Sequence, residues 1–285
     1  MQIIVNALGS AAIIAPAAVG FSLIFALFRF ANFAIGTYLT VGAFGTWVAN
    51  QWLGLPLAPS AAAGMLAACA TVTLSDVLVF RPIRSASAVT LLLASIALSF
   101  VLENLLRFVF GSQMKGFDLP LSRPLVLGPI HLAPEQLLGI GVSAAVLALL
   151  LAGLALLPWG RALRAAADDP SLAGARGVNI RRVHLYGLAL AGLLAGLSGT
   201  LAGVDLAIDP AMGGTLTIPV LAAAILGGVG SIPGAIAGAV LVGVAEELAV
   251  LSLGAVYKAG VGFVIIALVL LLRPQGLFGR SVARA

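Results

Sequence analysis

The feature that most constrains this chain is a series of apolar stretches, each about as long as a membrane is thick. A helix needs about 20 mostly apolar residues to cross the hydrocarbon core of a bilayer. Only 9% of the 285 residues are charged, against about 25% in an ordinary soluble protein, so solvated side chains could not cover a soluble surface. The chain is therefore predicted to be an integral membrane protein, with eight apolar stretches at about 6–28, 33–50, 58–80, 88–110, 136–157, 185–204, 231–251 and 257–272.

A ninth apolar stretch, at about 216–228, is shorter. Pro219 and the run Gly227-Gly228-Val229-Gly230 interrupt it, so it is expected to form a broken or half-length helix. Leu and Ala dominate throughout, and no stretch shows the alternation with a period of two that is typical of membrane β-strands. The expected fold is an all-α, polytopic helical bundle of about eight to nine transmembrane segments, in a single transmembrane domain over residues 1–285.

The distribution of basic residues predicts the orientation of the bundle, because cytoplasmic loops of membrane proteins are rich in Lys and Arg. If nine segments cross, the N-terminus lies outside the cell and the C-terminus in the cytoplasm. No basic residue precedes Arg29, so the first segment is expected to be a retained helix. The segment 158–184 is then cytoplasmic and the segment 111–135 extracytoplasmic. The predicted cytoplasmic residues are Arg29, Arg81, Arg84, the five arginines from 161 to 182, Arg273, Arg280 and Arg284, and the outer ones are Arg107, Lys115, Arg123 and Lys258.

No constellation of residues in the sequence points to catalysis. His131 and His184 lie in opposite compartments on this topology, and Cys69 is the single cysteine, so neither a metal cluster nor a catalytic triad is expected. The sequence has no Gly-x-x-x-x-Gly-Lys-Ser/Thr loop, the usual cradle for the phosphates of ATP. The 15 Lys and Arg residues are too dilute for a nucleic-acid surface. We expect no enzymatic activity and no cofactor on this chain, and if ATP drives it, another subunit must hydrolyse the ATP.

A few charged residues fall inside the apolar stretches, where burying a charge in lipid costs at least about 2.5–3.5 kcal/mol. They are Asp76, the pair Glu103 and Arg107 at i,i+4 spacing, and the adjacent Glu246 and Glu247, which are expected to point in different directions. Two interpretations stay open: local pairing at the membrane surface, or a polar lining for a substrate path. None is expected to lie alone at the middle of the membrane, which argues against transport driven by protons or sodium.

Glycine carries two further signals. Gly192 and Gly196, Gly199 and Gly203, and Gly234 and Gly238 repeat at a spacing of four, which favours close packing of helices and also allows a bundle that rocks between two states. The run from Gly227 to Gly234, with Ser231 and Pro233, cannot continue a membrane helix. Broken helices in transporters often mark a substrate site or a hinge, but the run could equally be an ordinary turn.

The segment 158–184 carries most of the polar residues between apolar stretches. Residues 160–167 favour a helix, and Asp169 before Pro170 is typical of the start of a second short helix that Gly177 would close. Two short helices would form a compact knob with small-residue faces. The knob is interpreted as a docking element for a cytoplasmic partner, or else as a solvated loop.

Four patterns in this order resemble the branched-chain amino-acid permease family of ABC importers, the LivH/LivM-type membrane subunits. The patterns extend over nearly the whole length of the chain. They are Asn32-Phe33-Ala34-Ile35-Gly36 with Gly42-Ala43-Phe44, then Gly160-Arg161-Ala162-Leu163-Arg164-Ala165 through Gly177-Val178-Asn179, then Gly227-Gly228-Val229-Gly230-Ser231 with Gly234-Ala235, and finally Arg273-Pro274-Gln275-Gly276-Leu277-Phe278-Gly279.

The resemblance implies a membrane subunit, most like LivH, in a bacterial inner membrane. It would pair with a homologous LivM-type second permease or with a second copy. Two cytoplasmic ATPases, which use ATP and Mg, would bind the coupling loops, and an extracytoplasmic binding protein would deliver substrate. The implied coupling residues are Gly160, Arg161, Arg164, Ala165, Ala166, Asp168 and Gly177, and the implied translocation-path or hinge residues are Asn32, Phe33, Gly36, Gly227, Gly228, Gly230 and Ser231.

Two positions depart from the family pattern. Ile35 stands where the family has a histidine after Asn-Phe-Ala, so no role of that histidine carries over. Arg164 precedes Ala165-Ala166, whereas the loop of the wider permease class begins Glu-Ala-Ala.

The predicted function is the permease subunit of an ABC importer that moves branched-chain or other small amino acids by alternating access. Within the family, urea, short amides or small aromatic acids are alternative cargo. An ion-coupled secondary carrier that works alone, and a scaffold subunit that transports nothing, are alternatives from other classes.

Overall fold

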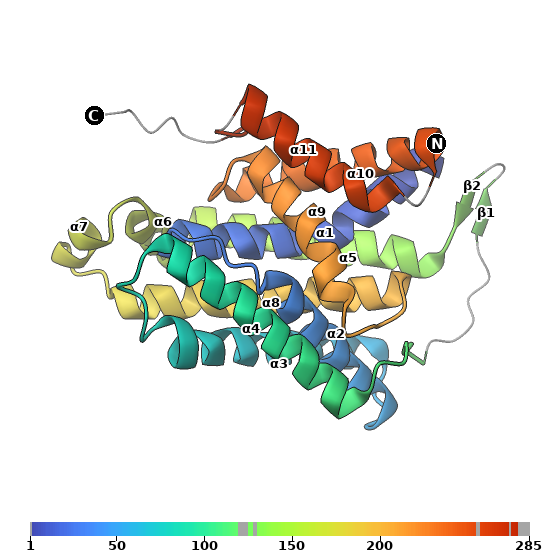
Figure 1. Cartoon of the computed structure of the whole chain (residues 1–285), viewed down its shortest axis with the longest axis horizontal. Coiled ribbons are helices and arrows are strands. Elements are labelled where there is room, and N and C mark those ends of the chain that lie inside the picture. The colour runs from blue at the N-terminus through green and yellow to red at the C-terminus, as the bar shows by residue number, and fades with distance from the viewer. Residues whose placement is uncertain (1, 119–124, 128–129, 255–256, 274, 279–285) are drawn as a thin grey trace.

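The computed structural model describes residues 2–118, 125–127, 130–254, 257–273 and 275–278. This part of the chain folds into one bundle of helices, with a short β-hairpin at one end (Figure 1). The elements in chain order are α1 (Gln2–Phe28), α2 (Ile35–Gln51), α3 (Leu57–Ser75), the π-helical turn η1 (Asp76–Phe80), α4 (Ala88–Phe110), β1 (Leu125–Leu127), β2 (Ile130–Leu132), α5 (Pro134–Leu156), α6 (Pro158–Asp168), α7 (Pro170–Ala175), α8 (Ile180–Asp205), α9 (Met212–Gly227), α10 (Ile232–Leu253) and α11 (Lys258–Leu272).

Each apolar stretch predicted from the sequence forms a helix, which confirms the all-α transmembrane bundle. Six helices in the described ranges are long and apolar enough to cross a membrane, namely α1, α3 with η1, α4, α5, α8 and α10. The other three predicted segments form the shorter helices α2, α9 and α11. Counting these, nine helices match the nine segments expected.

The predicted short helix is α9. Its 16 residues extend over about 24 Å at 1.5 Å per residue, less than the roughly 30 Å of a hydrocarbon core. Pro219 was expected to interrupt the segment, but it lies buried inside α9 and the helix continues through it. Gly262 of α11 packs against this point, with Pro219 N only 3.5 Å from where a Cβ would lie. Close packing of a neighbour is one way in which membrane helices accommodate proline.

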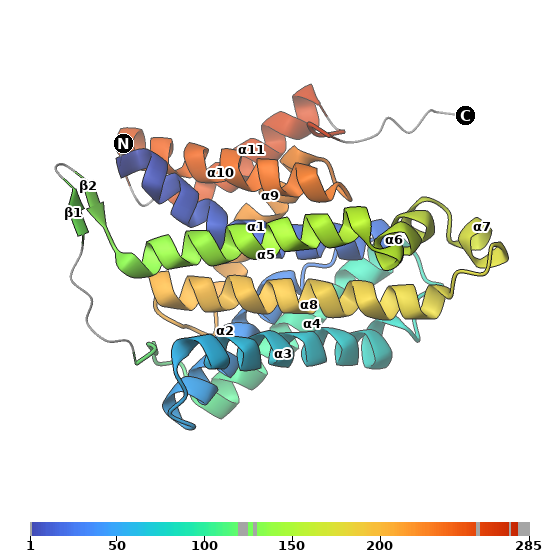
Figure 2. The ribbon, with the colours of Figure 1, turned by 180° about the vertical axis from the view of Figure 1, so that it is seen from behind.

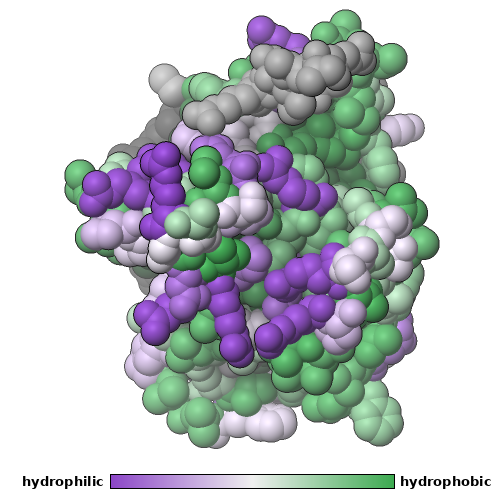
Figure 3. Space-filling view, turned by 90° about the vertical axis from the view of Figure 1, so that its left-hand side faces the viewer, coloured by the Kyte–Doolittle hydropathy of each residue, from purple (hydrophilic) through white to green (hydrophobic). Residues whose placement is uncertain are grey.

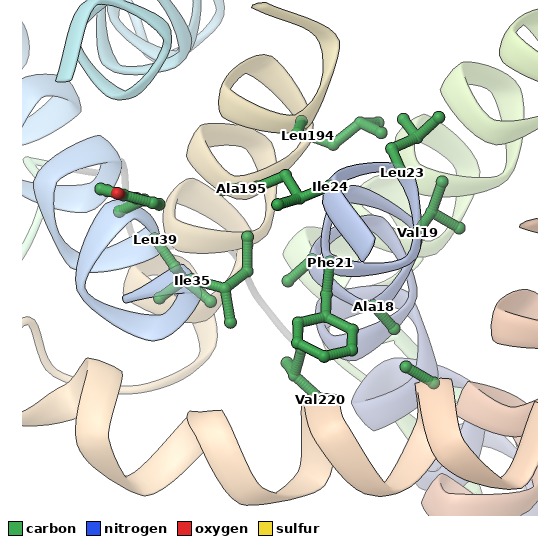
Figure 4. Packing of buried hydrophobic residues seen from close by; sticks show 14 of the residues in the cluster. Ala18, Val19, Phe21, Leu23, Ile24, Ile35, Leu39, Leu194, Ala195 and Val220 are labelled. Carbon is green, nitrogen blue, oxygen red and sulfur yellow. The ribbon is translucent and has the colours of Figure 1, made fainter. Parts of the chain in front are cut away.

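The centre of the bundle is α1, which packs against α5, α8, α9 and α10. Its apolar side chains are buried almost throughout, and Phe21 and Ile24 meet residues of α2, α8 and α9 in the core (Figure 4). The hydrophobic surface of α1 is therefore covered by the other helices, and α1 is the buried central helix of the bundle. The candidate spans α4 and α5, by contrast, are mostly exposed.

Small residues bring α2, α3 and α8 together, as the four-residue glycine spacing predicts. A Cβ on Gly192 of α8 would lie 2.6 Å from Cys69 Cα of α3, and one on Gly196 would lie 2.6 Å from Met65 Cα. The hydroxyls of Thr46 and Thr200 join α2 to α8 at 2.8 Å. These distances confirm close backbone packing, the first of the two interpretations of the spacing.

The two ends of the bundle differ. One end carries α6 and α7 and is called the α6–α7 end below. The opposite end carries the start of α1 and the β-hairpin, and α5 and α8 run side by side between the two ends (Figure 2).

The antiparallel hairpin pairs Leu125 with Leu132 and Leu127 with Ile130. It was not predicted, because strands of three residues outside the apolar stretches are too short to show a period. The expectations for Arg123, Arg280, Arg284, Pro274 and Gly279 fall outside the described residues.

Candidate functional site

The knob predicted at residues 158–184 consists of α6 and α7. Pro158 and Pro170 each occupy the first turn of their helix, where proline is favoured because its missing N–H has no helical partner to lose. One face of α6 packs on the bundle through Gly160, Leu163 and Ala166, which are buried. The predicted coupling residues therefore divide into two groups: Gly160 and Ala166 face inward, and Arg161, Arg164, Ala165 and Asp168 are exposed.

The corner between α5 and α6 is held by close packing at Gly160. A Cβ there would lie 2.5 Å from Leu154 Cα in the last turns of α5. The exposed face of α6 is thereby presented at a defined angle to the bundle.

Gly177 follows α7 with φ of +86°, the left-handed conformation expected of a residue that closes a helix.

Asp169 caps α7 as predicted. Its Oδ1 accepts hydrogen bonds from the hydroxyl of Ser171 at 2.6 Å and from the backbone N–H groups of Ser171 and Leu172 at 2.9 and 3.0 Å. The hydroxyl of Ser171, with these N–H groups, lowers the pKa of Asp169 below its ordinary value, because hydrogen bonds to a carboxylate favour its charged form. The knob therefore has an internally capped structure of its own.

The knob is tied to α1 by Arg29. The guanidinium of Arg29 donates a hydrogen bond to the carbonyl oxygen of Ala167 in α6. Within the described residues, Arg29 alone among non-glycine residues has a positive φ, of 58°, a conformation that is uncommon outside glycine. This link was not predicted, because a basic residue directly after a long helix gives no sign of its partner in α6.

The first group of predicted path or hinge residues, Asn32 and Phe33, lies in the non-helical break between α1 and α2. Asn32 is buried and its Oδ1 accepts from the N–H of Ala34 at 3.0 Å. The N–H of Phe33 donates to Ser95 Oγ at 3.0 Å, and Ser95 is a buried residue inside the span α4. The non-helical backbone of this break is thus satisfied in part by a residue of a candidate span, as backbone buried among membrane helices must be satisfied by protein.

Two buried hydroxyls near the centre of the bundle have no hydrogen-bond partner among the described residues. They belong to Tyr38 in α2 and Ser22 in α1.

Gly36, also in the predicted path, packs on α9. The carbonyl carbon of Gly213 lies 2.9 Å from where a Cβ on Gly36 would lie. The start of α2 therefore touches the start of α9.

The second predicted break, the glycine run, ends α9 and begins α10. Gly228 and Gly230 have φ of +100° and +88°, and Ser231 Oγ accepts from the N–H of Gly234 at 3.2 Å. Gly230 faces Phe25 and Ala26 near the end of α1. The run therefore makes a tight turn next to the same end of α1 that bears Arg29.

The glycine run also holds a later segment of the chain. The N–H of Leu277 donates to the carbonyl of Leu226 at 2.9 Å, and the N–H of Phe278 donates to that of Gly227 at 3.0 Å. Gly276 lies against Gly228. Residues 276–278 of the closing pattern are thus in direct contact with the glycine run, a contact that no local pattern in the sequence indicates.

The structure does not gather the predicted path residues into one cavity. Gly36 contacts the start of α9, and the glycine run lies at its other end. Both breaks lie beside the end of α1 that bears Arg29, and α9 extends from its contact with Gly36 to the glycine run.

The charged residues of the apolar stretches have local partners. Asp76 pairs with Arg84, and Glu103 pairs with Arg107 at 2.7 Å. The expectation that Glu246 and Glu247 point apart is wrong. Both approach the ammonium group of Lys258, at 3.8 and 3.3 Å, because that group lies between α10 and α1 and also donates to Ser10 Oγ.

The chain has close relatives among transport proteins. A family model described as the branched-chain amino acid transport system / permease component matches residues 3–272. The high-affinity branched-chain amino acid transport system permease protein BraD of Pseudomonas aeruginosa is 31% identical over 98% of this chain and 96% of its own length. The permease protein LivH of Escherichia coli is 28% identical over 92% of this chain and 90% of its own.

A solved structure shares the fold. An inward-facing putative metal-chelate type ABC transporter aligns with 95% of this chain and 85% of its own, with a TM-score of 0.50 and 20% sequence identity. The helical bundle is thus that of an ABC transporter permease, and the chain is a permease subunit of an ABC importer and a multi-pass membrane protein. It belongs to the branched-chain amino acid transport system / permease component family. ATPase and substrate-binding partners are general features of such transporters.

Proposed function

We propose that this chain is the LivH-type permease through which branched-chain or other small amino acids enter the cell. The observation that carries the proposal is the near full-length similarity to BraD and LivH, whose names state branched-chain amino acid transport. Urea, short amides and small aromatic acids remain the alternative cargo, since nothing local in the chain encodes the side chain of a substrate.

The α6–α7 end is proposed to face the cytoplasm, with the start of α1 outside, in a bacterial inner membrane. Arginines support this orientation, because Arg161, Arg164 and Arg176 of the knob and Arg181 and Arg182 of α8 all lie at that end. The segments 158–184 and 111–135 are then the cytoplasmic coupling loop and the extracytoplasmic loop of a single permease domain.

The exposed face of α6 is the proposed docking surface for an ATPase. Arg161, Arg164, Ala165 and Asp168 are accessible there, while Gly160 and Ala166 fix the helix to the bundle. The small side chain of Ala165 leaves room for a partner to approach closely, and the positive charges of the arginines can attract acidic side chains of that partner. Gly177 closes the knob and allows the chain to turn into α8.

Movement of the knob is proposed to reach the membrane through Arg29. When the ATPases close on ATP, α6 is displaced, and the hydrogen bond from Arg29 to Ala167 carries the displacement to the end of α1. Both helix breaks adjoin this region: Asn32, Phe33 and Gly36 follow Arg29, and Gly230 faces Phe25. Gly227, Gly228, Gly230 and Ser231 then act as the hinge, and alternating access follows from bending at the two breaks.

The complete importer is proposed to need partners. A LivM-type permease or a second copy of this chain would cover part of the exposed apolar surface, and lipid would cover the remainder. Two cytoplasmic ATPases would bind the knobs of the two permease subunits. An extracytoplasmic protein would deliver the cargo. This chain performs no covalent chemistry and holds no cofactor, so ATP and Mg are used by the ATPases.

The test is reconstitution. The tagged chain is isolated in mild detergent from its host, its partners are identified by mass spectrometry, and the complex is placed in liposomes with ATP on the side of the ATPases. We expect uptake of labelled leucine that requires both ATP and the binding protein, and that excess isoleucine or valine suppresses. Suppression by urea, acetamide or benzoate instead would assign the alternative cargo, and uptake by the isolated chain without ATP would contradict the proposal.

A further inference from the structure

An open cavity of about 670 Å³ lies at the α6–α7 end, between η1 and the first turns of α8. None of its lining residues belongs to the exposed face of α6 or to either helix break. Residues of α3 and the segment that follows η1 form one wall, and α8 forms the other. Among the lining residues are four arginines, Arg81, Arg84, Arg181 and Arg182.

The charge of this cavity is unbalanced. Asp76 is the one acidic lining residue, and it pairs with Arg84. Arg84 is further held by the ring of Phe28, whose centroid is 4.6 Å from its Cζ, and by His184 at 3.5 Å. Arg81, Arg181 and Arg182 are exposed and form no ion pair within the described part of the chain. Three uncompensated guanidinium groups around one hollow produce a positive potential that favours an anion.

The backbone adds donors at the same place. Asn179 lines the cavity and caps α8, accepting the N–H of Arg182 at 3.1 Å. The N–H groups of Ile180 and Arg181 also belong to the first turn, where a helix has no internal acceptors. They complement the arginines, whose planar forks suit the oxygens of a phosphate.

Part of the lining is apolar and belongs to the exposed sides of two candidate membrane spans. Val77, Leu185 and Leu188 line the cavity, and Val77 and Leu185 are 51% and 53% exposed. They lie in the candidate spans Leu57–Phe80 and Ile180–Asp205. Hydrophilic residues gather over this end of the molecule and apolar residues surround them (Figure 3). A ligand here can meet guanidinium groups and lipid-exposed side chains together.

We propose that this cavity binds the phosphate of an anionic phospholipid, with the acyl chains lying along the apolar surfaces of α3 and α8. Basic pockets between transmembrane helices recognise anionic headgroups in this way. A soluble phosphate compound would use the arginines but not Val77 and Leu185, so the mixed lining favours the lipid. Bound lipid would neutralise the arginines and hold η1 against the start of α8.

The experiment is native mass spectrometry of the purified full chain, delipidated in detergent and titrated with palmitoyl-oleoyl phosphatidylglycerol. The variant Arg81→Gln/Arg181→Gln/Arg182→Gln removes the unpaired charges of the cavity. The matched control, Arg161→Gln/Arg164→Gln/Arg176→Gln, removes the same charge from the knob. A third variant, Arg81→Lys/Arg181→Lys/Arg182→Lys, keeps the charge and separates the effect of charge from a folding defect. Glycerol phosphate and the corresponding phosphatidylcholine are the comparison ligands.

We expect the wild type, the control and the lysine variant to retain phosphatidylglycerol, and the glutamine variant of the cavity to bind it about tenfold more weakly. Phosphatidylcholine should bind more weakly than phosphatidylglycerol to the wild type and equally to all variants. Two results would overturn the proposal: equal retention of phosphatidylglycerol by the glutamine variant of the cavity and by the control, or displacement of the lipid by equimolar glycerol phosphate. The second result would assign a soluble anion.

Discussion

Arg29 and Ala167 join the first membrane helix to the knob: the guanidinium of one donates to the carbonyl oxygen of the other, across 138 positions of sequence. The contact lies where α1 ends, beside the helix break at Asn32. It gives the proposed ATPase-docking element a polar connection to the centre of the bundle, in addition to the apolar packing of Leu163 and Ala166.

Replacing Arg29 with glycine tests this connection. Glycine accepts the positive φ of Arg29 without strain, so Arg29→Gly removes the hydrogen bond and leaves the backbone undisturbed. Because the bond is exposed, its loss is worth about 1 kcal/mol, and we expect ATP-driven uptake to fall about fivefold while ATP hydrolysis continues. Arg176→Ala, which removes an exposed arginine of the knob, is the control. Equal uptake in the two variants would refute transmission through Arg29.

A bulky acid on the exposed face of α6 should uncouple ATP hydrolysis from transport. In Ala165→Glu the added side chain occupies the contact with the partner, and in Arg164→Glu the positive charge that α6 offers to the partner becomes negative. We expect uptake to fall at least about tenfold, with the permease still inserted in the membrane. ATPase activity and uptake are measured in the same liposomes, and Leu172→Glu on exposed α7 serves for comparison. Normal uptake in both α6 variants would refute docking on α6.

Gly228 should not tolerate a β-branched residue. Its φ of +100° costs a residue with a Cβ about 1–3 kcal/mol, and Gly276 approaches so closely that a Cβ on Gly276 would lie 2.5 Å from Gly228 Cα. Gly228→Val is expected to block uptake while the complex still assembles, as co-purification of the ATPases would show. Gly141→Val, at a position of α5 with open space around it, should leave uptake intact. Unchanged uptake in Gly228→Val would reduce the run to an ordinary turn.

The pair of Glu103 and Arg107 should be dispensable. The side chain of Arg107 is 46% exposed, and exposed i,i+4 pairs contribute about 0.3–0.5 kcal/mol. The double variant Glu103→Gln/Arg107→Gln is expected to keep uptake within about twofold of the wild type and to melt at nearly the same temperature. A large loss of uptake at unchanged stability would instead assign these side chains to a substrate path.

The helices of this bundle could be predicted because a membrane segment has one strong signature, apolar length. The predicted stretch 88–110 coincides with α4, and 231–251 comes within two residues of α10 at either end. The cap at Asp169 was predictable for a local reason, since an acid before proline satisfies the first N–H groups of a short helix.

Contacts between distant segments could not be predicted in the same way. Nothing near Arg29 identifies Ala167 as its acceptor, and Lys258 meets Glu246 and Glu247 only because α11 folds back beside α10. The continuation of α9 through Pro219 depends on Gly262, which lies in another helix. The β-hairpin likewise depends on pairing between two segments that are each too short to be recognised.

The contact between residues 276–278 and the end of α9 bears on the order in which the bundle forms during synthesis. Leu277 and Phe278 donate to Leu226 and Gly227, yet they leave the ribosome after α10 and α11 have been made. The carbonyls of Leu226 and Gly227 therefore enter the membrane before the N–H groups that they accept from in the folded chain. A fusion that pulls on residues 277 and 278 would act on the proposed hinge, so affinity tags on this permease belong at the start of α1.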